Sequence, residues 1–237
     1  YADAYSNMGN AFQKKGDLEA AIETYRQALK IKPDYADGYY NIGFALQKQG
    51  KLEEAIETYN KAILCEPDNA EAYNNIGIAL QEQGELEEAI KAYNKALSLK
   101  PDNAETYNNM GNALMDQARP KLEEAIEAYN KALSLKPDYA IAYNNIGNAL
   151  KEKGELEEAI DAYNKALSLK PNYHAARAQK LYHQSKICDW AAIEQDQDFI
   201  PLLGTSTKYI DPFVALSLED APERHRLRAE LFAKSEH

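Results

Sequence analysis

Cysteine, tryptophan and long apolar runs are scarce in this 237-residue chain. Its two cysteines, Cys65 and Cys188, lie far apart, which excludes a disulfide framework and indicates a reducing compartment. No apolar segment approaches the roughly 20 residues of a membrane-spanning helix, and the mean hydropathy is -0.63. The chain begins at Tyr1 with no signal-peptide pattern. We therefore expect a cytoplasmic protein without membrane contact. We also interpret the chain as a fragment that has lost repeats upstream.

Basic residues are also few, since 27 Lys and Arg stand against 38 Asp and Glu, for a formal net charge of -11. This balance argues against nucleic acid or an anionic membrane as a partner and favours a protein or peptide. No glycine-rich phosphate loop is present, so we assign no catalytic residue and expect no cofactor. The four histidines, at His174, His183, His225 and His237, have no metal-site spacing. We expect ordinary, partly exposed histidines and no metal.

A repeat dominates what is present. Five prolines are separated by 34, 34, 36 and 34 residues, at Pro33, Pro67, Pro101, Pro137 and Pro171. This period is typical of tetratricopeptide repeats, and residues 2–172 resemble that family. The units run approximately over 2–35, 36–69, 70–103, 104–139 and 140–173. The resemblance implies an all-α, right-handed superhelical solenoid of helix-turn-helix units, with a helical C-terminal cap and a partly irregular tail.

The third unit shows the pattern most cleanly. We expect one helix over about 70–83, a break at Gly84, a second helix over about 86–99, and a stop at Pro101 with Asp102. Apolar and small residues recur at helical spacing, so each helix has one packing face. We expect its small residues to allow close approach and its tyrosines to fill space between neighbouring units. These residues are Tyr73, Ile76, Gly77 and Leu80, then Ala89, Tyr93 and Ala96.

Two units depart from the pattern. Cys65 replaces the late leucine or isoleucine of a second helix, and we expect it to be a buried apolar thiol. The fourth unit has two extra residues and carries Arg119-Pro120 where the others have a turn glycine. Proline disfavours helix at the preceding residue. We therefore expect a rebuilt turn there, with a local change of superhelical pitch or a hinge through which chains could exchange arms.

After Pro171 the repeat fades. We expect a capping helix over about 173–187 with Asn172 as its cap, in which Leu181 replaces the small residue of earlier units. A short helix to about Phe199 should complete the cap over 173–199. Residues 200–237 read as a linker, with irregular or extended structure to 217 and a last helix over about 222–234.

The tail carries a second resemblance. The segment YHQSKICDW over 182–190, then Ile200-Pro201, then DPFVALS over 211–217, is followed by a helix with Arg224, Arg226 and Arg228. This series resembles the linker of O-linked N-acetylglucosamine transferases and SPINDLY-type glycosyltransferases. The resemblance implies a parent protein O-glycosyltransferase whose catalytic lobes would follow the linker. The arginines could suggest phosphate binding, but we read them as a solvated or lobe-docking helix face.

One asparagine recurs at the same slot of every first helix. This column, here called the asparagine ladder, consists of Asn7, Asn41, Asn75, Asn109 and Asn145. In the third unit it lies between the packing residues in sequence, so we expect it to project from the opposite side into a concave groove. An amide can donate to and accept from a peptide backbone together. The glycosyltransferases that this chain resembles grip substrate backbone with such a ladder.

Polar neighbours extend this expected surface. Asn74, Asn108 and Asn144 precede the ladder, with Ser6 and Tyr40 in the first two units. Asn10, Asn112 and Asn148 follow it one turn on, replaced by Phe44 and Ile78 in the middle units. Acidic residues stand one turn earlier, at Asp3, Asp37, Glu71 and Glu105, with Ile141 breaking that row. The alternative is that these asparagines only bond a neighbouring helix or solvate the groove. A clamp for a C-terminal carboxylate is disfavoured because the groove would place acids against the anion.

We therefore expect a protein-interaction module that binds extended segments through the ladder and through Asn74, Asn108, Asn144, Asn112 and Asn148. It would be the substrate-recognition part of an O-linked glycosyltransferase and not itself an enzyme. The alternative is a stand-alone scaffold for complex assembly, which gives no reason for the tail motifs. A homo-oligomer formed through the fourth unit or the tail is also expected. The apolar residues available in the tail are Trp190, Ile200, Leu202, Leu203, Ile210, Phe213 and Leu216.

Overall fold

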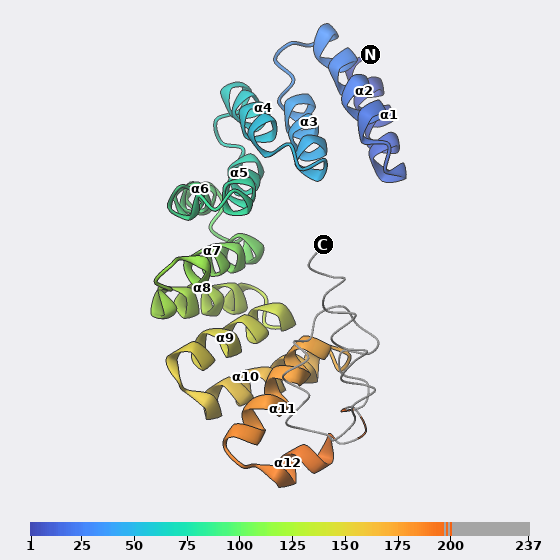
Figure 1. The fold of residues 1–237 in the computed structure, drawn as a ribbon. Coiled ribbons are helices and arrows are strands. Elements are labelled where there is room, and N and C mark those ends of the chain that lie inside the picture. The colour runs from blue at the N-terminus through green and yellow to red at the C-terminus, as the bar shows by residue number, and fades with distance from the viewer. Residues whose placement is uncertain (197, 199, 201–237) are drawn as a thin grey trace. The chain divides into compact units, whose positions relative to one another are not determined.

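The computed structural model describes residues 1–196, 198 and 200, and every regular element it assigns there is helical (Figure 1). The helices fall into two compact units, Tyr1–Glu124 and Ala125–His237. They are α1 (Ala2–Lys15), α2 (Leu18–Ile31), α3 (Ala36–Lys48), α4 (Leu52–Cys65), α5 (Ala70–Glu82), α6 (Leu86–Leu99), α7 (Ala104–Asp116), α8 (Leu122–Leu135), α9 (Ala140–Lys153), α10 (Leu156–Leu169), α11 (His174–Lys186) and α12 (Trp190–Gln195). Two expected helices of the third unit thus form within one residue of their predicted ends.

Local signals in the sequence start and stop these helices. Asn69 caps α5 by accepting from the Ala72 amide at 2.8 Å, and Asn103 caps α7 by accepting from Glu105 and Thr106 at 3.1 Å each. Gly84 ends the turn after α5 with φ of 80°, a left-handed conformation that favours glycine. Caps and left-handed glycines thus mark some of the helix ends, whereas other helices, such as α4 and α6, begin without a side-chain cap.

A glycine and a tyrosine bring the two helices of a hairpin together. In the third hairpin, Gly77 of α5 faces the ring of Tyr93 on α6, whose side chain is fully buried. The same pairing joins Gly43 to Tyr59, and Gly147 to Tyr163. The glycine leaves room for the ring inside its own hairpin. The second-helix tyrosines also lie against the next hairpin, as expected, because Tyr93 clusters with Ala113 of α7 and Tyr163 stacks on His183 of α11.

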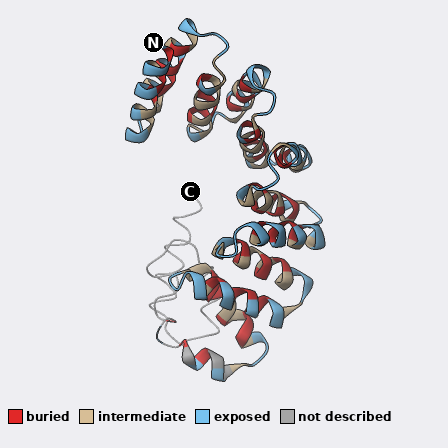
Figure 2. Cartoon of the chain, turned by 180° about the vertical axis from the view of Figure 1, so that it is seen from behind, coloured by how far each residue is buried: buried red, intermediate tan, exposed pale blue. Residues whose placement is uncertain are grey.

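Hairpins of the first unit stack through both their helices. The second helix of each hairpin packs on the first helix of the next, and α5 also contacts α3 and α7. One buried cluster extends from Ala21 on α2 to Ile76 on α5. Figure 2 shows the buried residues between the packed helices and the exposed residues away from them. The neighbouring first helices α3, α5 and α7 therefore share a surface along the stack.

The extra residues of the fourth repeat are absorbed in its turn. In other hairpins a backbone bond closes the turn over five residues, as from the Glu85 amide to the Leu80 carbonyl at 2.9 Å. In the fourth, the Lys121 amide reaches the Leu114 carbonyl at 3.1 Å. The turn is rebuilt as predicted, because Gln117 is extended with ψ of 147° whereas Gln83 at the same slot is helical with ψ of -8°. The change of pitch and the hinge stay predictions.

In the second unit α10 packs on α9 and α11, and α11 packs on α12. Leu181 is fully buried in a cluster with Ala178, Ile193 and Ile200, so the larger side chain at this slot fills space that a repeat tyrosine would take. Asp196 binds Arg177 of α11 at 2.5 Å and Lys180 at 2.7 Å. These charges fasten the turn after α12 to α11, which agrees with the expected cap.

Three expectations are corrected. Cys65 is exposed, because the slot is the last residue of its helix and extends beyond the core, as Ile31 does at 50% exposure. The cap of α11 is Tyr173, one residue after Asn172, and no side chain bonds there. His183 is buried at 5% exposure, between Tyr163 and Tyr182, because it lies on the face of α11 that packs on α10.

Several calls on the tail lie outside the described residues. They include the extended segment to 217, the helix over 222–234 with its arginines, and the side chain of Trp190. Of the apolar tail residues expected to mediate association, Ile200 is described, and it is buried against α11. The others outside the description are Leu202, Leu203, Ile210, Phe213 and Leu216, together with His225 and His237.

Candidate functional site

The asparagine ladder places one amide on each first helix. Asn41, Asn75 and Asn109 lie half-buried on α3, α5 and α7 of the first unit, and Asn7 is exposed on α1. Asn145 lies half-buried on α9 of the second unit. Because α5 contacts both α3 and α7, the ladder residues of these three helices belong to neighbouring elements of one surface.

Hydrogen bonds connect three of these helices through their side chains. The Asn75 amide donates to the Tyr40 hydroxyl at 3.0 Å, Asn74 donates to the Asn75 oxygen at 3.4 Å, and Asn109 donates to the Asn74 oxygen at 3.4 Å. We call this series, Tyr40–Asn75–Asn74–Asn109, the polar chain. It joins α3 to α5 and α5 to α7, and it orients the amides on a surface that would otherwise leave them mobile.

The remaining asparagines take different positions. Asn108 and Asn144 are buried, at 4% and 7% exposure, and Asn144 donates to the Asn145 oxygen at 3.4 Å. The Asn148 oxygen accepts from the Tyr163 hydroxyl at 2.9 Å. Asn112 is half-buried on α7. Asn108, Asn144 and Asn148 thus contribute to packing inside their units, and they present less polar surface than the sequence pattern suggested.

Glutamines replace asparagine in this packing role where the middle repeats have apolar residues. The phenol of Tyr59 donates to Gln47 at 3.0 Å, and that of Tyr93 donates to Gln81 at 3.0 Å. The first repeat uses both types, since Tyr25 donates to Asn10 at 2.7 Å and to Gln13 at 3.1 Å. Each buried hydroxyl thereby meets a partner. The middle repeats therefore need no asparagine at the slot of Phe44 and Ile78 to accept a hydrogen bond from the tyrosine.

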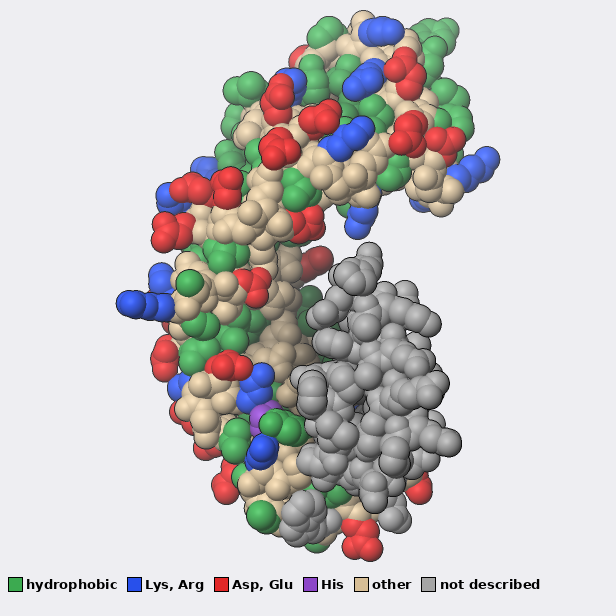
Figure 3. Space-filling view, viewed as in Figure 1, with side chains coloured by type: hydrophobic (Ala, Val, Ile, Leu, Met, Phe, Trp, Pro, Cys, Tyr) green, Lys and Arg blue, Asp and Glu red, His purple; other side chains and the backbone are tan. Residues whose placement is uncertain are grey.

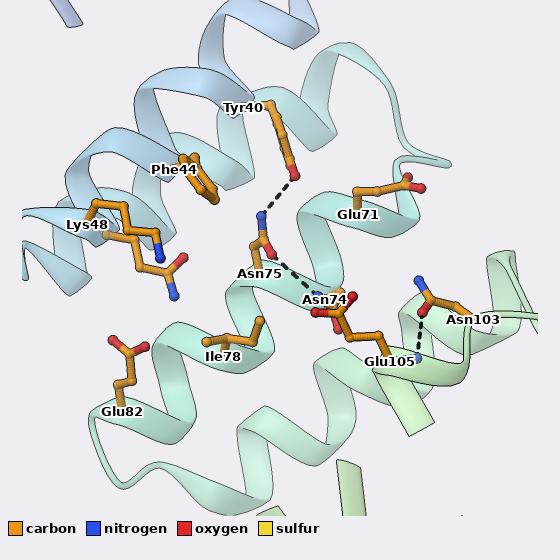
Figure 4. A pocket seen from close by; sticks show the side chains of 11 residues that line it. Tyr40, Phe44, Lys48, Glu71, Asn74, Asn75, Ile78, Glu82, Asn103 and Glu105 are labelled. Carbon is orange, nitrogen blue, oxygen red and sulfur yellow. Dashed lines mark hydrogen bonds between the residues drawn. The ribbon is translucent and has the colours of Figure 1, made fainter. Parts of the chain in front are cut away.

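A pocket of about 530 Å³ opens beside the polar chain, within the first unit (Figure 4). Asn74 and Asn75 lie at its centre, with Phe44, Lys48, Ile78 and Glu82 toward one end and Glu71, Asn103 and Glu105 toward the other. Tyr40 and Gln47 complete its lining. Sequence reasoning named the asparagines but missed Gln47, Lys48 and Glu82. Their position one or two turns after the ladder was the available signal.

The pocket has an acidic character. Three carboxylates and one ammonium group line it. Burial raises the pKa of Tyr40, the bond from Asn75 lowers it, and the charges of Glu71 and Glu105 raise it. Lys100 forms an ion pair with Glu71 at 2.8 Å, and this contact lowers the pKa of that carboxyl. Figure 3 shows acidic side chains interspersed with basic ones on the face it draws.

A second hollow, of about 660 Å³, lies at the start of α6 and the inserted turn. Leu86, Ile90, Gln117 and Arg119 are among the residues that line it. It holds none of the ladder asparagines. It is therefore a separate feature of the first unit.

Other kinds of site were also sought in the part of the chain that the structure describes. No group of three or more His, Cys, Asp or Glu residues there is arranged to hold a metal ion. Among the same residues, no helix has both the length and the apolar character needed to cross a membrane.

Comparison with known proteins agrees with this architecture. A family model described as TPR repeat matches residues 9–50, 48–84, 79–117 and 118–154, and one described as tetratricopeptide repeat matches 140–173. The crystal structure of MamA is 32% identical with a TM-score of 0.63, over 69% of this chain and 94% of that chain. No curated protein sequence matches.

Two further structures share the fold. PilF of Pseudomonas aeruginosa is 22% identical with a TM-score of 0.75, over 97% of both chains. YrrB, described as a TPR protein with an unusual peptide-binding site, is 24% identical with a TM-score of 0.62, over 76% of this chain and 92% of that chain. With the helical hairpins and the matched repeats in agreement, the chain belongs to the tetratricopeptide repeat family.

Proposed function

We propose that this protein binds an extended segment of a partner protein along the first helices, with the asparagine ladder holding the partner's backbone. The observation that carries the proposal is the polar chain beside the 530 Å³ pocket. A backbone has both donors and acceptors in a regular series, so a matching series of amides suits it.

The polar chain leaves hydrogen-bonding capacity for such a partner. A primary amide has two N–H donors and an oxygen that can accept twice. Asn75 spends one donor on Tyr40 and one acceptance on Asn74. Because this half-buried side chain also bonds Tyr59, one further acceptance by its oxygen can pair with a peptide N–H. Each such bond adds roughly 0.5–1.5 kcal/mol net, so several in register supply affinity with little dependence on partner side chains.

The burial pattern narrows the proposed contact residues. Asn7, Asn41, Asn75, Asn109 and Asn145 keep exposed or half-buried positions, as do Asn74 and Asn112. Asn108 and Asn144 are buried, and Asn148 serves Tyr163. We therefore assign the backbone contact to the ladder with Asn74 and Asn112, and we assign Asn108, Asn144 and Asn148 to packing.

The experiment is a selection of peptides from a random library on the immobilised protein. Affinities of selected peptides are then measured for a variant with Asn75, Asn109 and Asn145 each changed to Ala. We expect unchanged helicity and affinity lower by at least about tenfold, the equivalent of losing one or two net hydrogen bonds. A matched control changes Asn60, Asn94 and Asn130, exposed asparagines of second helices. Equal binding by both variants contradicts the proposal.

The tail resemblance supports a finer proposal, that this groove delivers substrate proteins to an O-linked glycosyltransferase domain. Its support is the motif series that includes Cys188-Asp189-Trp190, where α11 ends and α12 begins. Reading the coding sequence beyond the codon for His237 tests it. Two Rossmann-like lobes there would agree with the proposal, and a stop codon or an unrelated domain would contradict it.

A further inference from the structure

The pocket on α3, α5 and α7 is not uniform along its length. Its centre is the polar chain, which suits a peptide backbone. One end carries the apolar side chains of Phe44 and Ile78 together with Lys48 and Glu82, and the other carries Glu71 and Glu105 (Figure 4). Selectivity for side chains of the partner would arise from these two ends.

The apolar end is specific to two repeats. At this slot the first, fourth and fifth repeats have asparagine, whereas the second and third have Phe44 and Ile78. Both side chains are half-buried and line the pocket. Lys48 lies over the Phe44 ring, with its ammonium nitrogen 5.3 Å from the ring centroid. An apolar side chain inserted here would remove apolar surface from water on both sides.

The acidic end has charge that the fold leaves available. Glu71 and Glu105 are exposed in the first turns of α5 and α7. Lys100 compensates Glu71, but Glu105 makes no ion pair with any described residue. The influence of both charges on the Tyr40 hydroxyl shows that their negative potential extends into the pocket. A cation of the partner would therefore be attracted here, and an anion would be repelled.

The spacing of the ends fits a short extended motif. Glu71 and Ile78 lie seven residues apart on α5, which is about 10 Å along a helix. Side chains two residues apart in an extended peptide share a face and lie roughly 7 Å apart. The long stem of lysine or arginine covers the remaining distance.

We propose that the pocket between Phe44 and Glu105 selects extended partner segments in which an apolar residue lies two positions from a lysine or arginine. The proposal rests on the function proposed above and adds a partner chemistry to it. The apolar side chain lies on Phe44 and Ile78, the backbone pairs with Asn74 and Asn75, and the cation lies at Glu71 and Glu105.

The test measures binding of labelled nine-residue peptides to the whole chain by fluorescence polarisation. The probes have a serine and glycine frame around Leu-Ser-Arg, with the reverse order Arg-Ser-Leu as a second probe because the peptide direction is open. The comparison peptides are Leu-Ser-Glu, Leu-Ser-Ser and Ser-Ser-Arg, together with their reversed orders Glu-Ser-Leu, Ser-Ser-Leu and Arg-Ser-Ser, in the same frame. We expect one of the two Leu and Arg orders to bind about tenfold more tightly than its Glu counterpart, and less so at high salt.

Two double variants assign the ends. E71Q with E105Q should remove the preference for Arg over Glu and keep the preference for Leu over Ser. F44N with I78N installs the asparagine that the other repeats have at this slot. It should remove the preference for Leu over Ser and keep the preference for Arg over Glu. E53Q with E87Q is the matched control, because these exposed acids occupy first turns of α4 and α6 outside the pocket. It should bind as the parent protein does.

The outcomes separate this inference from the proposed function. If library peptides bind but Leu, Arg and Glu probes do not differ, the inference is overturned and ladder binding stands. If the preference exists but E71Q with E105Q leaves it unchanged, the assignment to this pocket is overturned. If no library peptide binds at all, the proposed function fails with it.

Discussion

A Cβ atom placed on Gly77 would lie 2.5 Å from Cε1 of Tyr93, closer than real Cβ contacts come. The ring is fully buried, and its hydroxyl donates to Gln81 at 3.0 Å. Glycine and tyrosine are therefore one packing unit that sets the distance between α5 and α6. Equivalent pairs in other hairpins repeat this distance along the array.

Changing Gly77 to Ala should destabilise the chain by about 1–3 kcal/mol, the usual cost of inserting atoms into a packed interior. The free energy of unfolding, measured with urea, checks this. In a Tyr93→Leu background the same change should cost less, because the ring that it meets is absent. Additive effects of the two substitutions would contradict the steric explanation.

Acid should weaken the cap on the last hairpin through His183. Burial lowers the pKa of this imidazole, and Lys151 and Lys186 lower it further, while Glu152 opposes them. Neither ring nitrogen bonds to a described residue. Since the folded pKa lies below the unfolded value of about 6.5, the neutral form is favoured by folding. Its contribution is present above that pH and is lost as pH falls through the folded pKa.

The measurement is the melting temperature between pH 7.5 and pH 5, compared with a His183→Phe variant. Phenylalanine keeps a flat ring beside Tyr163, whose ring lies nearly parallel to the imidazole. The variant should lose less stability on acidification than the parent protein. Identical pH profiles would show that this histidine does not titrate with folding.

Asp196 should hold the turn after α12 against α11. Its carboxylate accepts from both Arg177 and Lys180, and all three side chains are at most 15% exposed. Asp196→Asn leaves two cations poorly compensated, a change that typically costs about 3–5 kcal/mol at buried pairs. Hydrogen exchange should become faster in α12 and stay unchanged in α3–α6. Asp161→Asn, at an exposed acid of α10, is the control. Equal protection of α12 from hydrogen exchange in both variants would show that Asp196 does not hold this turn against α11.

The inserted turn of the fourth repeat should be replaceable. Exchanging Gln117–Pro120 for Gln-Gly restores the turn of the third repeat, and the bond from Lys121 to Leu114 marks the same closure as from Glu85 to Leu80. We expect full helicity and a stability change within about 1 kcal/mol, because turn length alone has a small effect. The reverse exchange at Gln83-Gly84 should be equally tolerated. Loss of cooperative melting would show instead that the insertion shapes neighbouring packing.

The helices and their ends could be predicted from sequence because local chemistry decides them. The bounds of α6 follow from an apolar period of 3.6 residues between Gly84 and Pro101. The glycine at position 77 was also readable as a close approach, because a repeated small residue has few other causes. That the Tyr93 ring would also fill the space beside Gly77 of its own hairpin was not readable, since periodicity names a face but not the element that covers it.

The candidate site divides in the same way. The column of five asparagines and its place on the first helices are properties of the sequence alone. Tertiary structure decided that Tyr40 pairs with Asn75 and that Asn108 is buried. These outcomes depend on which residues of the next hairpin arrive beside each side chain. The repeat is set by local propensity and period, whereas the chemistry of its surface is set by contacts between residues about 35 positions apart, as in the bond from Asn75 to Tyr40.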